Sequence, residues 1–185
     1  VSADKLTYTF TLRDGLKWHD GKPVRAADAV ASVKRWAVKD AAGQKLMART
    51  TSLEAVNDTT FVLKLKETYG LTIRALAKEY SYVPFILPER YAVQDSSKPF
   101  EGDVIGSGPF MFAANEWVPG AKTVYVKFKD YVPRKEPASF YAGGKKVNVD
   151  RVEFVVIPDQ STAVAALEKG EVDYVQRPHM DQWPL

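Results

Sequence analysis

Two stretches near the start of the chain alternate between apolar and polar residues. In residues 6–13, a tyrosine, a phenylalanine and a leucine are separated by threonines. In residues 59–66, apolar residues again occupy every second position. A period of two is typical of a strand with one buried face. Residues 51–56 precede the second stretch across the turn-forming pair Asn57-Asp58, so these segments predict a hairpin.

Glycine follows aspartate at two points, Gly15 and Gly21. Residues 16–19, between them, predict a short strand with a tight turn at each end, the second turn closing a hairpin. Glycine takes the positive φ of such turns without strain, whereas a β-branched residue there costs roughly 1 kcal/mol or more. We therefore predict structural roles for both glycines.

Several later segments have helical character. Residues 26–38 place apolar side chains three or four positions apart, which predicts a helix with one buried face. Residues 39–50 favour a second, shorter helix for which no capping residue is evident. Residues 71–77 and 88–93 are each long enough for a modest helix, and Pro88 suits a first turn.

A turn-rich segment, residues 95–102, is poor in aliphatic side chains and indicates a connection between subdomains. We place a boundary near residue 103. Residues 1–103 are then a small mixed α+β subdomain with β-hairpins, and residues 104–185 are a partial α/β segment. Within the latter, residues 132–148 combine prolines, glycines and basic side chains, which is typical of a solvated excursion.

The second segment is expected to contain a new sheet. Three strands are predicted, at residues 110–116, 123–130 and 149–157, and the last is apolar enough to be central. Asp159 is suited to cap a helix that Gly170 ends, and residues 172–175 return as a strand. This strand–helix–strand order predicts a β-α-β unit with a right-handed connection.

Composition narrows the function classes. The 185 residues are 45% hydrophobic and 26% charged, as in soluble globular proteins. The 26 basic and 23 acidic residues are mixed along the chain, giving a net charge of +3, which disfavours nucleic acid as a partner. Cysteine is absent, which excludes thiol catalysis, disulfides and thiolate metal sites. The chain starts without methionine, so we expect that upstream residues were cleaved or omitted.

Few residues form a catalytic or metal-binding pattern. His19 and Asp20 are adjacent on a predicted strand, so they point to opposite faces and are poorly placed to share a proton. The other histidine, His179, lies in an irregular tail, and the serines lack a neighbouring histidine or a nucleophile elbow. We therefore predict no catalytic residue and no metal site. A glycoside hydrolase that uses a carboxylate pair and a non-catalytic structural or interaction module remain the alternatives.

The longest motif is YTFTLRDGLKWHDGKPV, residues 8–24. Further matches follow in order at Asp28 to Val30, at residues 105–110 and at residues 159–174. Together they resemble family 5 of the bacterial extracellular solute-binding proteins, the dipeptide- and oligopeptide-binding group. Arg25 departs from the pattern, because the family usually has a threonine cap there. Family members are more than twice as long, so the chain is expected to be part of a longer protein.

The resemblance implies an α/β (mixed α+β) fold of the periplasmic-binding-protein-like type II. The fold is incomplete here, with a small mixed subdomain and part of the first large lobe. The implied function is that of a periplasmic, or more generally extracytoplasmic, solute-binding component of an ABC importer, which is not an enzyme and has no cofactor. Its implied partners are a peptide or similar small solute and the membrane permease. It is expected to be a monomer that binds no nucleic acid.

Two segments carry site predictions. Gly106 and Gly108 precede a strand instead of a helix and lack a P-loop lysine, so we interpret them as structural turns where the backbone crosses between subdomains. In the tail, Gln176, Arg177 and His179 offer a cation and polar tips that suit a carboxylate-bearing ligand. A solvated loop is the alternative interpretation of the tail. In the family, most ligand contacts come from segments outside these residues, so residues 1–185 alone are expected to bind ligand weakly or not at all.

Overall fold

The structure is a computed structural model that describes residues 1–98, 100–140 and 142–182. Contacts within the chain divide it into two units. The first consists of Val1–Met111 and Lys127–Asn148, and the second of Phe112–Val126 and Val149–Leu185. The chain therefore leaves the first unit, returns to it and leaves again, whereas the sequence predicted one change near residue 103.

The difference arises from contacts made after the turn-rich segment 95–102. The backbone N–H of His19 donates to the carbonyl of Gly106 at 2.9 Å. Nη1 of Arg13 donates to the carbonyl of Val132 at 3.1 Å. A run of turn formers marks a loop, but tertiary contacts decide which unit the flanking chain packs against.

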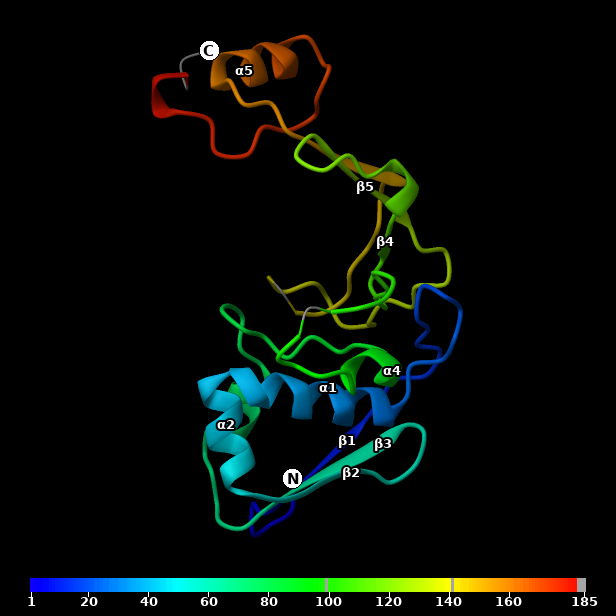
Figure 1. The fold of residues 1–185 in the computed structure, drawn as a ribbon, viewed down its shortest axis with the longest axis vertical. Coiled ribbons are helices and arrows are strands. Elements are labelled where there is room, and N and C mark those ends of the chain that lie inside the picture. Colours follow the sequence, from blue (N-terminus) through cyan, green and yellow to red (C-terminus); the bar gives the residue numbers. More distant parts are fainter. Residues whose placement is uncertain (99, 141, 183–185) are drawn as a thin grey trace. The chain divides into compact units, whose positions relative to one another are not determined.

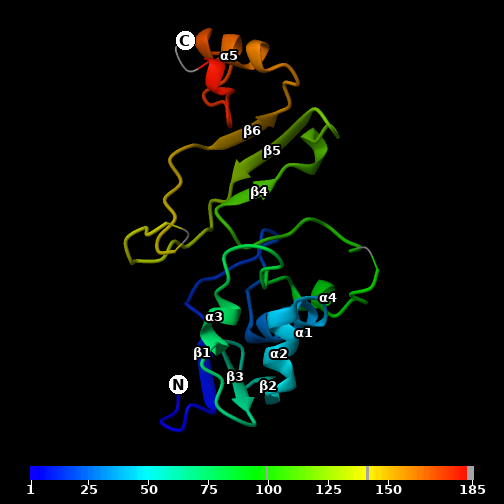
Figure 2. The same cartoon turned by 90° about the vertical axis from the view of Figure 1, so that its left-hand side faces the viewer.

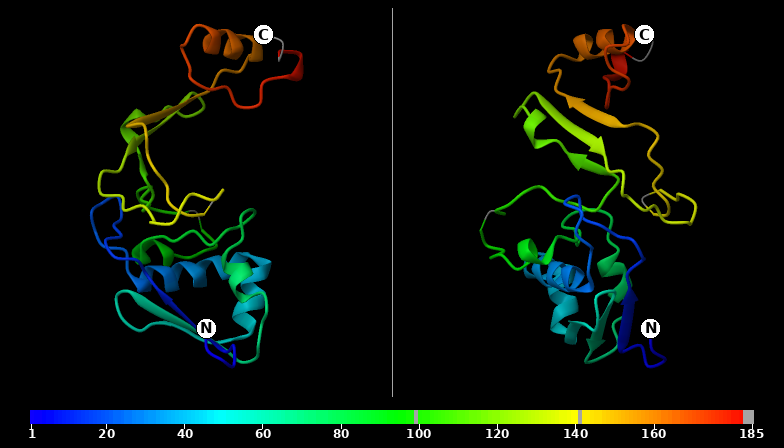
Figure 3. Two further views of the ribbon diagram at one scale, coloured as in Figure 1. Left: turned by 180° about the vertical axis from the view of Figure 1, so that it is seen from behind. Right: turned by 90° about the vertical axis from the view of Figure 1, so that its right-hand side faces the viewer.

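An antiparallel sheet forms the base of the first unit. Its strands are β1 (Thr7–Thr11), β2 (Thr50–Ala55) and β3 (Thr60–Leu65), in the order β1-β3-β2. Figure 3 shows the hairpin of β2 and β3 in cyan from two sides. The predicted first strand and the predicted hairpin are both confirmed. The strand predicted at residues 16–19 does not form; this segment has only one isolated bridge, from Lys17 to Pro23, across the turn at Asp20-Gly21.

Helix α1 (Ala26–Lys39) covers one face of this sheet and packs on β2 and β3 (Figure 1). Its helical spacing places alanines, valines and Trp36 toward the strands. Leu63 of β3 is 1% exposed in this core, and burying a leucine of this kind contributes roughly 2 kcal/mol. The predicted helix at 26–38 is confirmed.

Helix α2 (Ala41–Ala48) follows at once and confirms the weaker prediction at 39–50. Its cap, missed in the sequence, is Asp40. The carboxylate of Asp40 accepts hydrogen bonds from the N–H groups of Ala42 and Gly43 at 2.9 and 3.0 Å. It also pairs with Nζ of Lys78. An aspartate at this position satisfies N–H groups that have no partner inside the helix.

Two short helices complete the regular structure of the first unit, α3 (Thr72–Leu76) and α4 (Glu89–Ala92). Both predicted helices are confirmed, although each is shorter than expected. Pro88 stands at the N-cap of α4, just before the first turn. In the described part of residues 132–148, no helix or strand forms beyond an isolated bridge from Ser139 to Ala142, as the composition predicted.

The second sheet contains β4 (Phe110–Phe112), β5 (Lys122–Lys127) and β6 (Arg151–Val155), in the order β4-β5-β6 (Figure 2). The predicted strand at 110–116 is shorter in the structure, because residues Ala114–Glu116 form a 3-10 turn. Aromatic rings cross the sheet, with the ring of Tyr125 5.8 Å from that of Phe112 and 5.9 Å from that of Phe154.

Strand β6 is not central, contrary to the prediction for 149–157. It pairs antiparallel with β5 on one side, and Phe154 and Val155 are 60% and 50% exposed. Apolar composition reports a tendency to be buried and does not show that a neighbouring strand is present. The strand prediction therefore held, but its position in the sheet was wrong.

Helix α5 (Gln160–Glu168) begins where predicted, because the carboxylate of Asp159 accepts the N–H of Thr162 at 2.8 Å. Gly170 follows its end with a φ of +70°. The predicted strand at 172–175 does not form, so the described residues contain no β-α-β unit. A strand requires a hydrogen-bonding neighbour, and none is present beside these residues in the described part of the chain.

Candidate functional site

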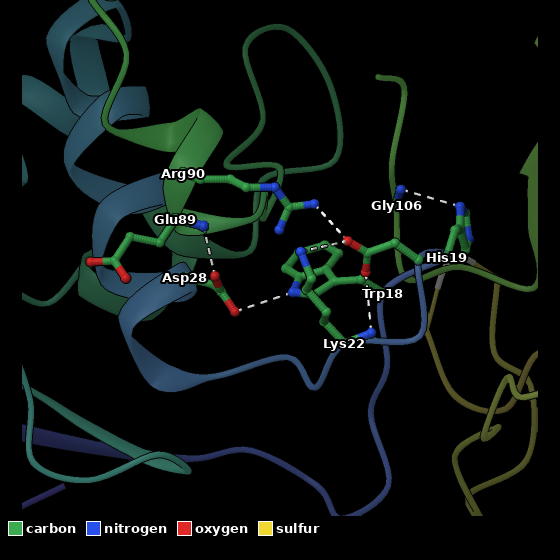
Figure 4. A network of polar contacts seen from close by, with 8 residues as sticks. Trp18, His19, Lys22, Asp28, Glu89, Arg90 and Gly106 are labelled. Carbon is green, nitrogen blue, oxygen red and sulfur yellow. Dashed lines mark hydrogen bonds and ion pairs between the residues drawn. The ribbon is translucent and has the colours of Figure 1, made fainter. Parts of the chain in front are cut away.

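The buried carboxylate of Asp28 is the centre of a polar network in the first unit (Figure 4). Its Oδ2 accepts the indole N–H of Trp18 at 3.2 Å and the backbone N–H of Arg25 at 2.7 Å. Its Oδ1 accepts the backbone N–H of Glu89 at 2.6 Å. Asp28, in the first turn of α1, thereby connects three parts of the first unit. These are the turn formed by residues 16–24, the start of α1 and the start of α4.

The position of Asp28 also explains how α1 begins without a threonine cap. Arg25 stands at the N-cap, and Asp28 is the third helical residue. The Asp28 carboxylate reaches back to the Arg25 N–H, which is the second half of a capping box. A negative charge in the first turn also interacts favourably with the helix dipole.

Asp20 forms a second, more exposed cluster at the tip of the turn. Its Oδ2 lies 2.7 Å from Nη2 of Arg90 and 3.6 Å from Nζ of Lys22, and its Oδ1 accepts the N–H of Lys22 at 3.1 Å. Burial raises the pKa of Asp20, but the hydrogen bonds from Lys22 and Arg90 outweigh it and hold this pKa below its ordinary value. Asp20 is therefore an ion-pair partner of these cations instead of a base for His19.

His19 binds the backbone of the glycine-rich segment. Its Nδ1 accepts the N–H of Gly106 at 3.2 Å, and its Nε2 lies 3.0 Å from the carbonyl of Gly108. Because an N–H only donates and a carbonyl only accepts, the ring proton belongs on Nε2. The edge of the ring meets Phe128 at a centroid distance of 5.0 Å. Both ring nitrogens of His19 are thus occupied by backbone groups.

The four glycines predicted as structural turns occupy different backbone environments. Gly15 and Gly21 have φ angles of +75° and +81°, the left-handed region in which side chains are strained. At Gly106, a Cβ would lie 3.2 Å from Cε1 of His19, so a close approach favours glycine there. At Gly108, a Cβ would meet nothing within 4 Å.

The predicted ligand-lining residues Gln176, Arg177 and His179 lie in the irregular chain after α5, in the second unit. All three are exposed, and Arg177 has a positive φ of +57°. None of their side chains makes a hydrogen bond or ion pair with another residue of the described ranges. Their role in ligand binding stays a prediction.

An open hollow of about 680 Å³ lies on the first unit between α1, β2 and the residues around α4. Val30, Ala31 and Leu53 supply apolar surface, while Lys34 and Glu54 supply charges of both signs. Arg35 and Glu89 also line the hollow, so it combines apolar surface with several charged side chains.

The described residues contain neither a cluster of potential metal ligands nor a candidate membrane span. Among them, no three histidine or acidic side chains gather as metal ligands, and none of their helices is long and apolar enough to cross a membrane. Glu116 and Glu153 both pair with Arg151, at 2.6 Å each. The hydrogen bonds from Arg151 lower the pKa of both carboxyl groups. A glycosidase acid requires a raised pKa, so this pair is unsuited to that role.

A family model decides the classification. The model of bacterial extracellular solute-binding proteins, family 5 Middle, matches residues 1–185. The chain belongs to this family. The resemblance found in the sequence motifs is thereby confirmed.

Two relatives of this family 5 chain carry names that refer to peptide binding. A probable peptide ABC transporter periplasmic-binding protein of Sinorhizobium fredii is 49% identical, over 100% of this chain and 34% of the relative. The probable D,D-dipeptide-binding periplasmic protein of Escherichia coli is 26% identical, over 98% of this chain and 33% of the relative. The chain spans about a third of the length of these relatives.

Solved structures confirm the fold class. A periplasmic binding protein of A. tumefaciens R10 in complex with agropinic acid matches with a TM-score of 0.66 and 29% identity, over 93% of this chain and 32% of that chain. The protein DppA of Helicobacter pylori in complex with the peptide STSA matches with a TM-score of 0.63 and 26% identity, over 93% and 35%. The chain is thus a mixed α/β part of a periplasmic-binding-protein fold.

Proposed function

We propose that the full-length protein is the extracytoplasmic solute-binding component of an ABC importer. It binds a peptide or a similar small solute and delivers it to the membrane permease. The observation that carries this proposal is the family 5 match over the whole chain, together with 49% identity to a probable peptide-binding relative. In this proposal the protein acts as a monomer outside the cytoplasm. The relative that is 49% identical is named as a probable periplasmic-binding protein, which supports this location.

In this proposal the segment is a scaffold and performs no chemistry. The buried Asp28 network holds the start of α1 and the start of α4 together, and His19 holds the segment from Gly106 to Gly108. The carboxylate of Asp28 and both ring nitrogens of His19 are committed to these structural contacts. The mixed surface charge gives no basis for binding nucleic acid.

Arg177 is proposed to receive a carboxylate of the solute, with Gln176 and His179 beside it in the chain. Two matched proteins, crystallised with agropinic acid and with mannopinic acid, bind ligands that are acids by name. A guanidinium binds a carboxylate through paired, charge-assisted hydrogen bonds. The exposed Arg177 side chain has no competing acidic partner among the described residues.

The proposal is tested by a thermal-shift screen of the full-length protein against dipeptides, longer peptides and opines. A ligand present at 100 times its dissociation constant stabilises the folded state by about 2.7 kcal/mol, which raises the melting temperature clearly. A folded protein that no solute of the panel stabilises would contradict the proposal.

The role of Arg177 is tested with Arg177→Ala in the full-length protein, against Lys169→Ala as a matched removal of an exposed cation from the same unit. Loss of a charge-assisted hydrogen bond worth about 1.5–3 kcal/mol predicts a drop in affinity of roughly tenfold to a hundredfold for Arg177→Ala. Equal affinities of the two variants would remove Arg177 from the binding site while leaving the proposed function intact.

A further inference from the structure

His19 joins two segments of the first unit that lie far apart in the sequence, and Figure 4 shows its ring beside Gly106. Nδ1 of His19 accepts the backbone N–H of Gly106 at 3.2 Å, and Nε2 lies 3.0 Å from the carbonyl of Gly108. The main-chain N–H of His19 donates to the carbonyl of Gly106 at 2.9 Å. Residues 106–108, here called the glycine segment, therefore bind both the side chain and the main chain of His19.

Only one protonation state of His19 makes both side-chain contacts. A neutral imidazole has one N–H and one bare nitrogen, which match a carbonyl and an N–H respectively. An imidazolium has an N–H on each nitrogen, so its Nδ1 has no lone pair to accept the N–H of Gly106. Two donors then face each other, and the N–H of Gly106 loses its partner. The contact of Nε2 with Gly108 persists, because Nε2 donates in both states.

The ring of His19 has no acidic partner among the described residues. The ring of Phe128, whose centroid lies 5.0 Å away, offers no hydrogen-bond acceptor. Asp20 pairs with Arg90 and Lys22, and Asp130 pairs with Lys17. The other titratable side chains within three positions of the residues that contact the ring are Asp103, Tyr125, Lys127, Lys129 and Tyr131. A charged ring therefore has no bound carboxylate that replaces the lost hydrogen bond.

We propose that His19 is an acid-sensitive latch on the glycine segment. Histidine gains its charge roughly between pH 8 and pH 5. The neutral ring holds Gly106 and Gly108 at the upper end of this range, and the bond to Gly106 is lost as the pH falls through it. The main-chain bond between His19 and Gly106 does not involve the ring, so acid loosens the glycine segment without detaching it.

The glycine segment lies where the chain is about to leave the first unit. It leads into β4, within which the chain passes from the first unit to the second. The carbonyl of Pro109 accepts the N–H of Phe128 at 2.8 Å, and this main-chain bond does not involve the ring of His19. The loosening is therefore confined to residues 106–108. In this way the mobility of the chain ahead of β4 depends on pH, a property that goes beyond solute binding.

The test is hydrogen–deuterium exchange of the full-length protein at pH 8 and pH 5, resolved to single amides by mass spectrometry. Protection factors are compared, because they correct for the intrinsic pH dependence of exchange. The N–H of Gly106 reports the latch, and the N–H of Phe128 is the internal reference. The variant His19→Asn keeps an acceptor oxygen at the position of Nδ1 and has no charge at either pH. The matched control, His179→Asn, removes the other histidine of residues 1–185 and keeps the latch.

The wild type and His179→Asn should both lose roughly tenfold in protection of the Gly106 N–H between pH 8 and pH 5, as expected for one lost hydrogen bond. Protection of the Phe128 N–H should stay within about twofold, because its bond has no titrating partner. In His19→Asn, protection of Gly106 should also stay within about twofold over this range. His19→Ala should show low protection of Gly106 at both pH values.

The latch is refuted if the wild type protects Gly106 equally at the two pH values, or if His19→Asn loses as much protection as the wild type. An equal loss at Gly106 and Phe128 would refute it as well, because acid would then act on the whole unit. The comparison of these two amides in the wild type needs no substitution, so it decides the question even where a variant does not fold. Each of these results leaves the proposed solute binding untouched.

Discussion

The carboxylate of Asp28 gives the sharpest test of the first unit, because three donors depend on it. Asp28→Ala leaves the indole N–H of Trp18 and the backbone N–H groups of Arg25 and Glu89 without their acceptor. An unsatisfied buried donor costs about 1–3 kcal/mol, so the three sum to an upper bound of several kcal/mol. Entry of water to the two helix starts reduces this sum, and we expect a loss of about 3–5 kcal/mol in the free energy of unfolding.

The assay is urea unfolding of the full-length protein followed by tryptophan fluorescence, with Glu54→Ala as an exposed carboxylate control on the same unit. Asp28→Asn should lose less, about 1–3 kcal/mol, because the amide has one acceptor oxygen and cannot serve donors on both sides. A double-mutant cycle with Trp18→Phe should return a coupling of about 1 kcal/mol for the indole hydrogen bond. An Asp28→Ala protein within about 0.5 kcal/mol of the control would refute the reasoning.

Three further outcomes are expected in the full-length protein. Leu63→Ala should lower the free energy of unfolding by about 2–5 kcal/mol in urea melts, and a loss under 1 kcal/mol would show that Leu63 is not a core residue. Gly21→Val should cost roughly 1 kcal/mol or more in the same assay because φ is +81°, whereas an unchanged midpoint would contradict the left-handed turn. Burial raises the pKa of Asp40, but the hydrogen bonds from Lys78, Gly43 and Ala42 and the charge of Lys78 together outweigh it and hold this pKa below its ordinary value of 3.8. The stabilisation by this carboxylate is therefore present above about pH 4 and is lost as the pH falls through the folded-state value. The melting temperatures of the wild type and of Asp40→Asn should therefore converge as the pH falls from 7 to 3. A difference in melting temperature that stays constant over this range would contradict a stabilising role of the ionised Asp40.

Much of the first unit followed from local pattern. The strand at the start, the hairpin of β2 and β3, and α1 were predicted because their apolar period matches a surface that is buried on one side. Helix α2 was predicted weakly, since Asp40 becomes recognisable as a cap only when the start of the helix is known. These elements could be predicted because the pattern that indicates each of them lies in residues close together in the sequence.

The errors concern contacts between distant residues. Strand β6 was expected in the centre of a sheet and lies at its edge, and residues 172–175 form no strand. In both cases the apolar pattern reports which residues favour burial but carries no information about the neighbour that would bury them. The boundary near 103 differs from the observed units for a related reason, because the chain returns to the first unit at Lys127.

The polar network around Asp28 could not be predicted from the sequence. Asp28 and Glu89 are 61 positions apart, and no local pattern links them. The available signal was an aspartate three positions after Arg25, where a capping box places an acidic residue. That signal identifies the bond to the Arg25 N–H and does not identify Trp18 as a further donor.

The central claim is that the protein binds a solute and leaves it chemically unchanged. The most direct measurement is calorimetry of the full-length protein with the best solute of the screen, followed by mass spectrometry of the recovered ligand. The account predicts saturable binding of one ligand per monomer and recovery of the ligand intact. Conversion of the ligand to a product, or the absence of binding by the folded protein, would contradict the account.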